Sequence, residues 1–163
     1  MHMLHARLNS TLFLFFFLSA ISQAQTLSGV YKVEQLFSRI ENKDTLYVLN
    51  FWATWCKPCM EELRSIDSVG QEFKTSKTKL LFVNLDFSDK TAQVNQVLKQ
   101  KQILSECVLL DEVNGNAYID RISEKWSGEI PATVLIKEGN KTLISKKLSA
   151  AQLRTAIEKT QTQ

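Results

Sequence analysis

Apolar positions in this chain follow two kinds of pattern. Short continuous runs rich in β-branched and aromatic residues occupy 45–53, 79–87 and 107–111, and such runs are typical of buried strands. Over 58–73 and 89–103, apolar residues instead recur at every third or fourth position, which predicts amphipathic helices with one buried face. The alternation of the two patterns predicts an α/β domain.

The flanking segments complete the predicted architecture. The sequence Glu-Gly-Asn at 138–140 predicts a tight hairpin turn, and Ser149 can cap a closing helix. The remaining predicted elements are a helix at 33–41, a turn with a short helix at 114–122, strands at 131–137 and 142–148, and the closing helix at 149–160. This order predicts a mixed central β-sheet flanked by helices on both faces, in one domain without repeats.

The first 24 residues differ from the rest of the chain. Arg7 precedes the apolar segment TLFLFFFLSAI, and Ser22 and Ala24 then supply a small-x-small cleavage site. These are the parts of a secretory signal peptide, so we expect 1–24 to be removed and 25–163 to form a single exported domain, with the periplasm as its compartment. An uncleaved anchor is the alternative, although the apolar segment is shorter than the roughly 20 residues that span a bilayer. No cysteine follows this segment directly, which excludes a lipid-anchored cysteine at a new N-terminus.

Composition and charge narrow the class of protein. Of the 163 residues, 44% are hydrophobic and 23% are charged, which suits one globular domain with a substantial core. The net charge is +3, and the basic residues are spread along the chain among acidic ones. We therefore expect neither nucleic-acid binding nor a polybasic lipid-binding segment. A monomer is the favoured oligomeric state.

Two of the three cysteines, Cys56 and Cys59, lie at the predicted junction between a strand and a helix. A disulfide between them closes so small a loop that it removes little entropy from the unfolded chain, so a structural cross-link explains the pair poorly. A zinc site is also disfavoured, because it needs four ligands and the only histidines, His2 and His5, lie in the signal segment. Disulfides persist outside the cytosol, so the pair is best interpreted as a redox centre without metal or cofactor.

The predicted helix start gives the two cysteines different roles. Cys56 is expected near the helix N-cap, where the helix dipole, free N–H groups and the neighbouring Lys57 favour its thiolate. Pro58 fits the first turn of this helix, where its missing N–H has no partner to lose. Cys59 lies one turn further along and should be more deeply buried. We therefore expect Cys56 to be the nucleophile that forms a mixed disulfide, and Cys59 to resolve it.

The segment NFWATWCKPC, at 50–59, resembles the active-site segment of thioredoxin-fold proteins, specifically of the exported TlpA/ResA-type thiol–disulfide oxidoreductases. The blocks LFVNLDFSD, VLLDEVNG and IPATVLI follow in the order of that family, so the similarity extends over most of 25–163. The resemblance implies a thioredoxin-like fold and a protein-disulfide oxidoreductase with a redox-active Cys56–Cys59 disulfide. Its implied partners are thiol- or disulfide-containing exported proteins and a membrane electron donor or acceptor.

The resemblance also bears on the direction of the reaction. The family leans towards reduction, for instance in cytochrome c maturation or in keeping exported thiols reduced, so a reductase is favoured over an oxidase. Two other functions remain open, a redox-inert binding or chaperone module and a peroxide-reducing enzyme on the same fold. The intact cysteine pair argues against the first, and the lack of a Pro- and Thr-rich peroxidatic loop argues against the second.

The same resemblance places the substrate-binding surface. Ile130–Pro131 matches the cis-proline loop that faces the cysteines in this family, and cis peptide bonds are nearly confined to X–Pro. Trp55, Lys57 and Pro58 match the part of the surface that lies beside the first cysteine.

Glu62 matches a partly buried acid that the family often carries three residues after the second cysteine. A buried carboxyl with a raised pKa could relay a proton to or from Cys59. The alternative is that Glu62 only favours the first helical turn through the helix dipole. Asn50 occupies the strand position where ordinary thioredoxins have a buried Asp, and its neutrality fits the TlpA/ResA type.

Four residues depart from the family pattern or remain open. Glu129 stands where many thioredoxins have Gly, and Arg64 stands where some relatives have a helix-kinking Pro. Cys107 is extra; we expect it to be a buried strand residue, with a third redox thiol as the alternative. Trp126 is expected either to line the substrate groove or to cap the core.

Overall fold

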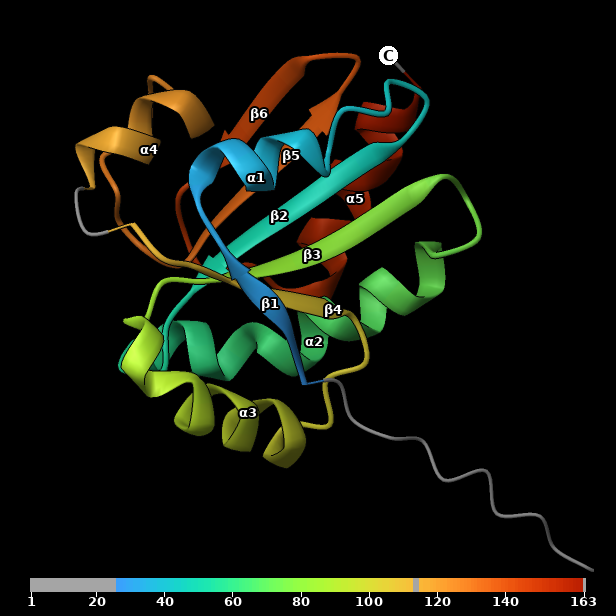
Figure 1. Ribbon diagram of the computed structural model, residues 1–163. Coiled ribbons are helices and arrows are strands. Elements are labelled where there is room, and N and C mark those ends of the chain that lie inside the picture. Colours follow the sequence, from blue (N-terminus) through green and yellow to red (C-terminus); the bar gives the residue numbers. More distant parts are fainter. Residues whose placement is uncertain (1–25, 113–114, 163) are drawn as a thin grey trace, which may run out of the picture.

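In the computed structural model, which describes residues 26–112 and 115–162, one mixed β-sheet runs through the molecule (Figure 1). The strand order is β1-β4-β3-β2-β5-β6, and β2 pairs in parallel with β3 but antiparallel with β5. The strands are β1 (Leu27–Tyr31), β2 (Leu46–Trp52), β3 (Thr78–Asn84), β4 (Glu106–Leu110), β5 (Ala132–Lys137) and β6 (Asn140–Ile144). The predicted signal peptide at 1–24 lies outside the described residues.

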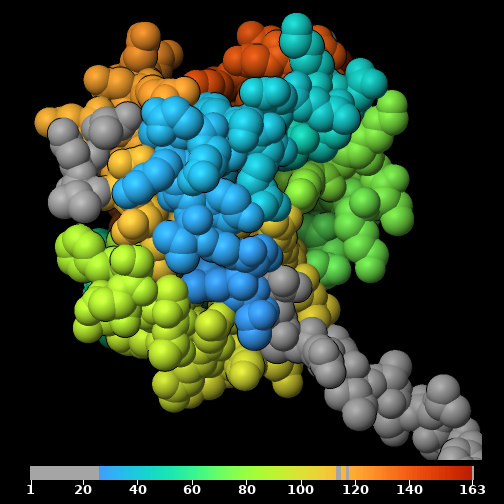
Figure 2. All heavy atoms as spheres, viewed as in Figure 1, coloured from blue at the N-terminus to red at the C-terminus, as the bar shows by residue number. Residues whose placement is uncertain are grey.

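Helices cover both faces of this sheet, as the sequence predicts. They are α1 (Val33–Ser38), α2 (Lys57–Phe73), η1 (Ser88–Lys90), α3 (Thr91–Gln100), α4 (Asn116–Ile122) and α5 (Ala150–Gln161). Apolar residues of α2, α3 and α5 form one core cluster, while α1 and α4 contribute to a second cluster on the opposite face. In the space-filling view, the blue segment that contains β1 and α1 lies across the middle of the visible face (Figure 2). Within the described part of the chain, no helix is both long and apolar enough to span a bilayer.

Strand β2 is buried along its whole length, which explains why its sequence is a continuous apolar run. Successive side chains point to opposite faces, so Val48 and Trp52 pack with α2 while Leu49 and Phe51 pack with α1. The strand ends at Trp52, and four residues later the chain reaches Cys56. The cysteines therefore lie at the carboxyl edge of the parallel strands, where open α/β sheets place their sites.

The structure adds one strand and changes several predicted boundaries. Strand β1 was not predicted, because it is a short edge strand whose residues are only half-buried or exposed. The strand predicted at 79–87 ends at Asn84, because Asn84 and Asp86 form local hydrogen bonds that turn the chain away. The helix predicted at 89–103 divides into η1 and α3. The strand predicted at 142–148 begins two residues earlier and ends at Ile144.

Two other local predictions are confirmed. Glu138 and Gly139 both have positive φ, at 52° and 84°, and they form the two-residue turn between β5 and β6. Ser149 caps α5 through a capping box with Gln152. After this hairpin, the segment before α5 contacts α2 through the hydrogen bond from Leu148 to Glu62.

Candidate active site

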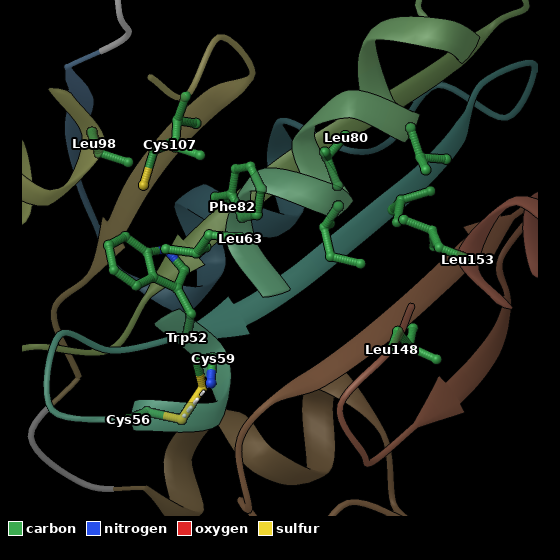
Figure 3. Packing of buried hydrophobic residues seen from close by; sticks show 14 of the residues in the cluster. Trp52, Cys56, Cys59, Leu63, Leu80, Phe82, Leu98, Cys107, Leu148 and Leu153 are labelled. Atoms are coloured by element: carbon green, nitrogen blue, oxygen red, sulfur yellow. Dashed lines mark hydrogen bonds between the residues drawn. A yellow bond between two sulfur atoms is a disulfide. The ribbon is translucent and has the colours of Figure 1, made fainter. Parts of the chain in front are cut away.

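A disulfide joins Cys56 and Cys59 at the amino end of α2, with an S–S distance of 2.08 Å and 5.3 Å between the Cα atoms (Figure 3). Cys56 is the N-cap residue, and the backbone N–H of Cys59 donates to its Sγ at 3.3 Å. The exposed fraction is 5% for Cys56 and 0% for Cys59. The predicted position of Cys56 at the helix start and the deeper burial of Cys59 are therefore both confirmed.

The sequence explains why the helix starts at this point. Lys57 and Pro58 form the first turn, where proline loses no intrahelical hydrogen bond. Within this turn the N–H of Cys59 points back to Cys56 Sγ, and the positive end of the helix dipole lies at the same place. Both effects stabilise negative charge at the position of Cys56 Sγ.

The Ile130–Pro131 peptide bond is cis, in agreement with the expectation from the sequence. The Ile130 carbonyl oxygen lies 3.7 Å from Cys56 Sγ, so this loop and the amino end of α2 meet at the first cysteine. Trp126 supports the loop, because its Nε1 donates to the Glu129 carbonyl at 2.8 Å. Trp126 is only 3% exposed, so it lies in the core, which is one of the two positions that the sequence predicted.

The side chain of Glu62 is buried below the disulfide-bearing turn, with 1% of its surface exposed. Its Oε1 accepts a hydrogen bond from Asn50 Nδ2 at 3.0 Å, and its Oε2 accepts one from the backbone N–H of Leu148 at 2.6 Å. Asn50 also donates to Thr133 Oγ1 at 3.0 Å, so β2, β5, α2 and the segment before α5 are connected around this carboxyl. Burial raises the pKa of Glu62 above its ordinary value of 4.5, and the two hydrogen bonds partly oppose this rise.

The neighbouring residue, Glu61, is in a contrasting environment. It is exposed, and it forms an ion pair with Lys147 at 2.5 Å. This contact lowers the pKa of Glu61, so the two adjacent carboxyls shift in opposite directions. Both glutamates contact the segment at Lys147 and Leu148, and together they join the start of α2 to the segment that precedes α5.

A second pair of loops meets beside Cys56. The carboxylate of Asp86 accepts hydrogen bonds from the backbone N–H and the hydroxyl of Thr54, both at 2.8 Å, and a third from Asn84 at 2.8 Å. The residues that follow Thr54 and Asp86 are Trp55 and Phe87, and their exposed fractions are 69% and 70%. The exposure of Trp55 agrees with its predicted place on a binding surface.

Sequence reasoning missed Asp86, Thr54, Leu148 and Phe87 as parts of this region. The strand predicted at 79–87 contained both Asp86 and Phe87 and implied that Phe87 was buried. The available signal was the polar run of Asp86, Ser88 and Asp89 around Phe87, which is unusual for a strand end.

The remaining candidates lie away from the disulfide. Cys107 is fully buried in β4, which confirms the strand-core prediction, and burial raises the pKa of its thiol. It belongs to the same core cluster as Trp52 and the two bonded cysteines, and in Figure 3 the indole of Trp52 is seen between them. Arg64 donates to the Gln102 carbonyl at 2.6 Å, on the outer side of α2. Glu129 is exposed at the edge of the cis-proline loop.

The described residues contain no group of three or more His, Cys, Asp or Glu side chains that could hold a metal ion. The reactive groups described at this site are the two bonded sulfur atoms and the buried carboxyl of Glu62. A disulfide at a helix amino end, next to a backbone carbonyl and a carboxyl with a raised pKa, is suited to the exchange of one S–S bond for another.

Comparisons with known proteins agree with this geometry. The sequence profile of the AhpC/TSA family matches residues 24–142. The thioredoxin-like protein YneN of Bacillus subtilis (strain 168) is 30% identical over 93 residues, which cover 57% of this chain and 51% of YneN. The sporulation thiol-disulfide oxidoreductase A of the same organism is 33% identical over 72 residues, 44% of each chain. This chain thus spans about half the length of these curated relatives.

Among solved structures, a thioredoxin-related protein from Neisseria meningitidis serogroup B has a TM-score of 0.66 and 21% identity. The match covers 76% of this chain and 90% of the Neisseria protein. This similarity shows that the chain has the thioredoxin fold, in agreement with the mixed sheet and the helices on both of its faces.

Proposed function

The chain belongs to the AhpC/TSA family, and from that premise we propose that it is a thiol–disulfide oxidoreductase whose working group is the Cys56–Cys59 pair. The observation that carries the proposal is the place of this disulfide, at the amino end of α2 and against the Ile130 carbonyl. One relative is named sporulation thiol-disulfide oxidoreductase A, which describes the same reaction and supports the proposal.

In the reductive direction that we propose, the Cys56 thiolate attacks one sulfur of a partner disulfide. A bond forms between Cys56 Sγ and that sulfur while the partner S–S bond breaks, and its electron pair leaves on the second partner sulfur, which takes up a proton. The Cys59 thiolate then attacks Cys56 Sγ, so the mixed disulfide breaks and the partner leaves as a dithiol. Two electrons have passed to the partner, and the protein holds its Cys56–Cys59 disulfide again.

We propose that Glu62 accepts the proton of the Cys59 thiol and later returns it. Cys59 and Glu62 are three residues apart on α2, so they lie on neighbouring positions of one helix face. A carboxyl with a raised pKa can take up the proton of the Cys59 thiol and later return it, because its affinity for a proton is then closer to that of a thiol. The neutral partner Asn50 supports this role, since it adds no second charge to the buried site.

Partner binding is proposed to involve Trp55, Lys57, Pro58 and the Ile130–Pro131 loop. Trp55 and Lys57 are exposed on either side of Cys56 in the sequence, and the Ile130 carbonyl oxygen lies 3.7 Å from Cys56 Sγ. A partner segment that contacts these residues brings its sulfur to Cys56. This arrangement suits recognition through the backbone, with selectivity supplied by the side chains around it.

Export and a membrane electron donor are part of the same proposal. They rest on the signal-like sequence at 1–24, with its Arg7, apolar core and small residues at 22 and 24. A protein that reduces partner disulfides outside the cytosol must receive two electrons for each turnover, and a membrane donor is the class of partner that can supply them. Exported proteins with cysteines, including those of cytochrome c maturation, are the proposed substrates.

The proposal is tested by the reduction of insulin disulfides with dithiothreitol as the electron source. The wild-type protein should accelerate the reaction, whereas Cys56→Ser should leave only the uncatalysed rate. In a separate reaction without dithiothreitol, Cys59→Ala that was reduced beforehand should accumulate a mixed disulfide with insulin through Cys56, which mass spectrometry of the non-reduced protein detects. Absence of turnover in the wild type would favour a redox-inert binding module, and peroxide consumption faster than disulfide reduction would favour a peroxide-reducing enzyme.

The direction of electron flow is tested separately by equilibrating the protein in glutathione buffers. A reductase should have a reduction potential closer to that of thioredoxin, about −270 mV, than to that of the oxidant DsbA, about −120 mV. A value near the second figure would reverse the proposed direction but leave the exchange chemistry intact.

A further inference from the structure

Phe87 is a large apolar side chain that the fold leaves exposed. Its exposed fraction of 70% is the highest among the large hydrophobic residues that are exposed in the described part of the chain, namely Val30, Trp55, Phe87 and Leu104. It stands in the polar segment between β3 and η1, followed by Ser88, Asp89 and Lys90. Its packing therefore contributes little to the core, and its apolar surface is available to a partner.

The position of Phe87 is fixed by the loop that carries Trp55. Thr54 donates two hydrogen bonds to Asp86, and the backbone N–H of Leu85 donates to the Trp52 carbonyl at 2.9 Å. These contacts hold the two loops together immediately before each exposed aromatic residue. Both loops follow parallel strands, β2 and β3, so Trp55 and Phe87 lie at the edge of the sheet that carries the disulfide.

We propose that Phe87 is a specificity-determining residue, which forms with Trp55 an aromatic pair that binds an apolar side chain next to the target cysteine of an extended partner segment. The inference rests on the proposed function and adds the class of partner that this site selects. Trp55 was already expected at the binding surface; Phe87 extends that surface onto the loop after β3.

The accessibility of the disulfide argues for this kind of partner. Cys56 is 5% exposed and Cys59 is fully buried, so a partner sulfur reaches them only when the flanking backbone lies close to the protein. An extended segment advances about 3.3 Å per residue, so a partner chain over Cys56 carries the residues adjacent to its own cysteine across the neighbouring loop. Exposed aromatic side chains are frequent anchors for such contacts.

Charge also favours an apolar rather than a charged partner residue. Asp89 and Lys90, which follow Phe87 closely, have opposite charges, and Asp89 Oδ2 lies 3.4 Å from Lys90 Nζ. The carboxylate of Asp86 is already engaged by Thr54 and Asn84. Asp86 is also only 5% exposed, so the surface next to Phe87 offers an approaching chain an apolar contact and little accessible charge of one sign.

The test uses two five-residue peptides, Gly-Leu-Cys-Leu-Gly and Gly-Ser-Cys-Ser-Gly, each joined through its cysteine to thionitrobenzoate. The reduced protein attacks the peptide disulfide and releases the coloured thiol, so absorbance gives a second-order rate constant for each peptide. We expect the wild type to prefer the leucine peptide by about tenfold, which corresponds to about 1.4 kcal/mol. In Phe87→Ser this preference should fall to about threefold or less, and Phe87→Leu should restore most of it.

Two controls separate docking from other effects. Leu104→Ser removes an exposed apolar residue that precedes β4, at the opposite edge of the sheet, and should retain the full preference. Bis(2-hydroxyethyl) disulfide has no amino-acid side chains that could contact Phe87. The Phe87→Ser protein should therefore reduce it at the wild-type rate.

An unchanged preference in Phe87→Ser would overturn the proposal, and so would an equal loss of rate towards the small disulfide. The aromatic pair would instead be a contact between copies of this chain if sedimentation showed a dimer that Phe87→Ser dissociates. Failure of the wild type to react with any of the three probes would refute the proposed function itself, which is a distinct result.

Discussion

The backbone N–H of Leu148 donates a hydrogen bond to Glu62 Oε2 at 2.6 Å, across 86 residues of sequence. Asn50 occupies the other oxygen of the same carboxyl, so Glu62 is buried with a partner on each side. The adjacent Glu61 instead reaches solvent and pairs with Lys147. Two consecutive glutamates thus have the same chain segment as partner but opposite shifts in pKa, which makes them a matched pair for experiment.

Glu62→Gln should change how stability depends on pH. Burial raises the folded-state pKa of Glu62, so its contribution to stability is fully present below the ordinary value of 4.5 and is lost as pH rises through the raised pKa. The free energy of unfolding of the wild type, taken relative to Glu62→Gln, should therefore fall as pH increases above 4.5. Urea unfolding at a series of pH values measures this difference.

Glu61→Gln is the control for that series. Its pKa is lowered by Lys147, so its contribution is present above 4.5 and is lost as pH falls through the lowered pKa. The wild type relative to Glu61→Gln should gain stability as pH rises, with the opposite slope. If both variants gave slopes of the same sign, Glu62 would not be titrating in the buried site.

Cys107 should resist alkylation in the folded protein. It is fully buried and its thiol pKa is raised by burial, so it presents almost no thiolate to a reagent. After selective reduction, iodoacetamide at about pH 8 should modify Cys56 first and leave Cys107 unmodified, whereas in urea Cys107 should react like an ordinary thiol with pKa of about 8.5. Peptide mass spectrometry locates the modified residue, and rapid native labelling of Cys107 would contradict its buried position.

Gly70→Ala should destabilise the protein although Gly70 lies within a helix. A Cβ atom at Gly70 would lie 2.4 Å from Leu80 Cδ2 and 2.8 Å from Leu80 Cβ, so α2 and β3 would have to move apart. Alanine gains about 1 kcal/mol in helix preference, but overpacking costs about 1–3 kcal/mol, and we expect a net loss in urea unfolding. Ser68→Ala, on the exposed side of α2, should change stability by no more than about 0.5 kcal/mol. A stabilised Gly70→Ala protein would show that the helix and strand separate without cost.

Ser149→Ala should weaken the start of α5. Ser149 Oγ accepts a hydrogen bond from the Gln152 N–H at 3.3 Å, and Gln152 Oε1 accepts one from the Ser149 N–H at 2.9 Å. Loss of this capping box should cost about 1 kcal/mol in the free energy of unfolding. Thermal or urea unfolding measures the loss, and the Ser68→Ala protein again serves as the comparison. Equal stability of the two serine variants would mean that the cap contributes nothing.

Much of the fold follows from local patterns. The buried run of β2, the apolar stripe of α2 and the cap at Ser149 each depend on residues that are close in sequence. Each feature is found where the sequence predicts it. The place of Cys56 at the start of α2 was also predictable, because Pro58 limits where the helix can begin. The cis bond at Pro131 was expected only from the family resemblance.

The contacts that complete the site were not predictable in this way. The partner of Glu62 is a backbone N–H, which every residue other than proline carries, so no side-chain pattern marks Leu148. Asp86 was assigned to a strand because its neighbours are apolar, and only the fold brings Thr54 to its carboxylate. Strand β1 escaped prediction because its pairing with β4 depends on residues about 80 positions away, as at Leu27 and Cys107.

Cys56 and Cys59 are close in sequence, but residues that contact their site, such as Ile130 and Leu148, are synthesised much later. A growing chain that has just passed Cys107 carries three chemically similar thiols, and neither the Ile130 carbonyl nor the Leu148 N–H yet exists. In the completed molecule one thiol lies within the sheet, in β4, while the other two cysteines are joined at a helix end. The burial of Cys107 between β1 and β3 thus removes it from the pairings that would otherwise be open to Cys56 and Cys59.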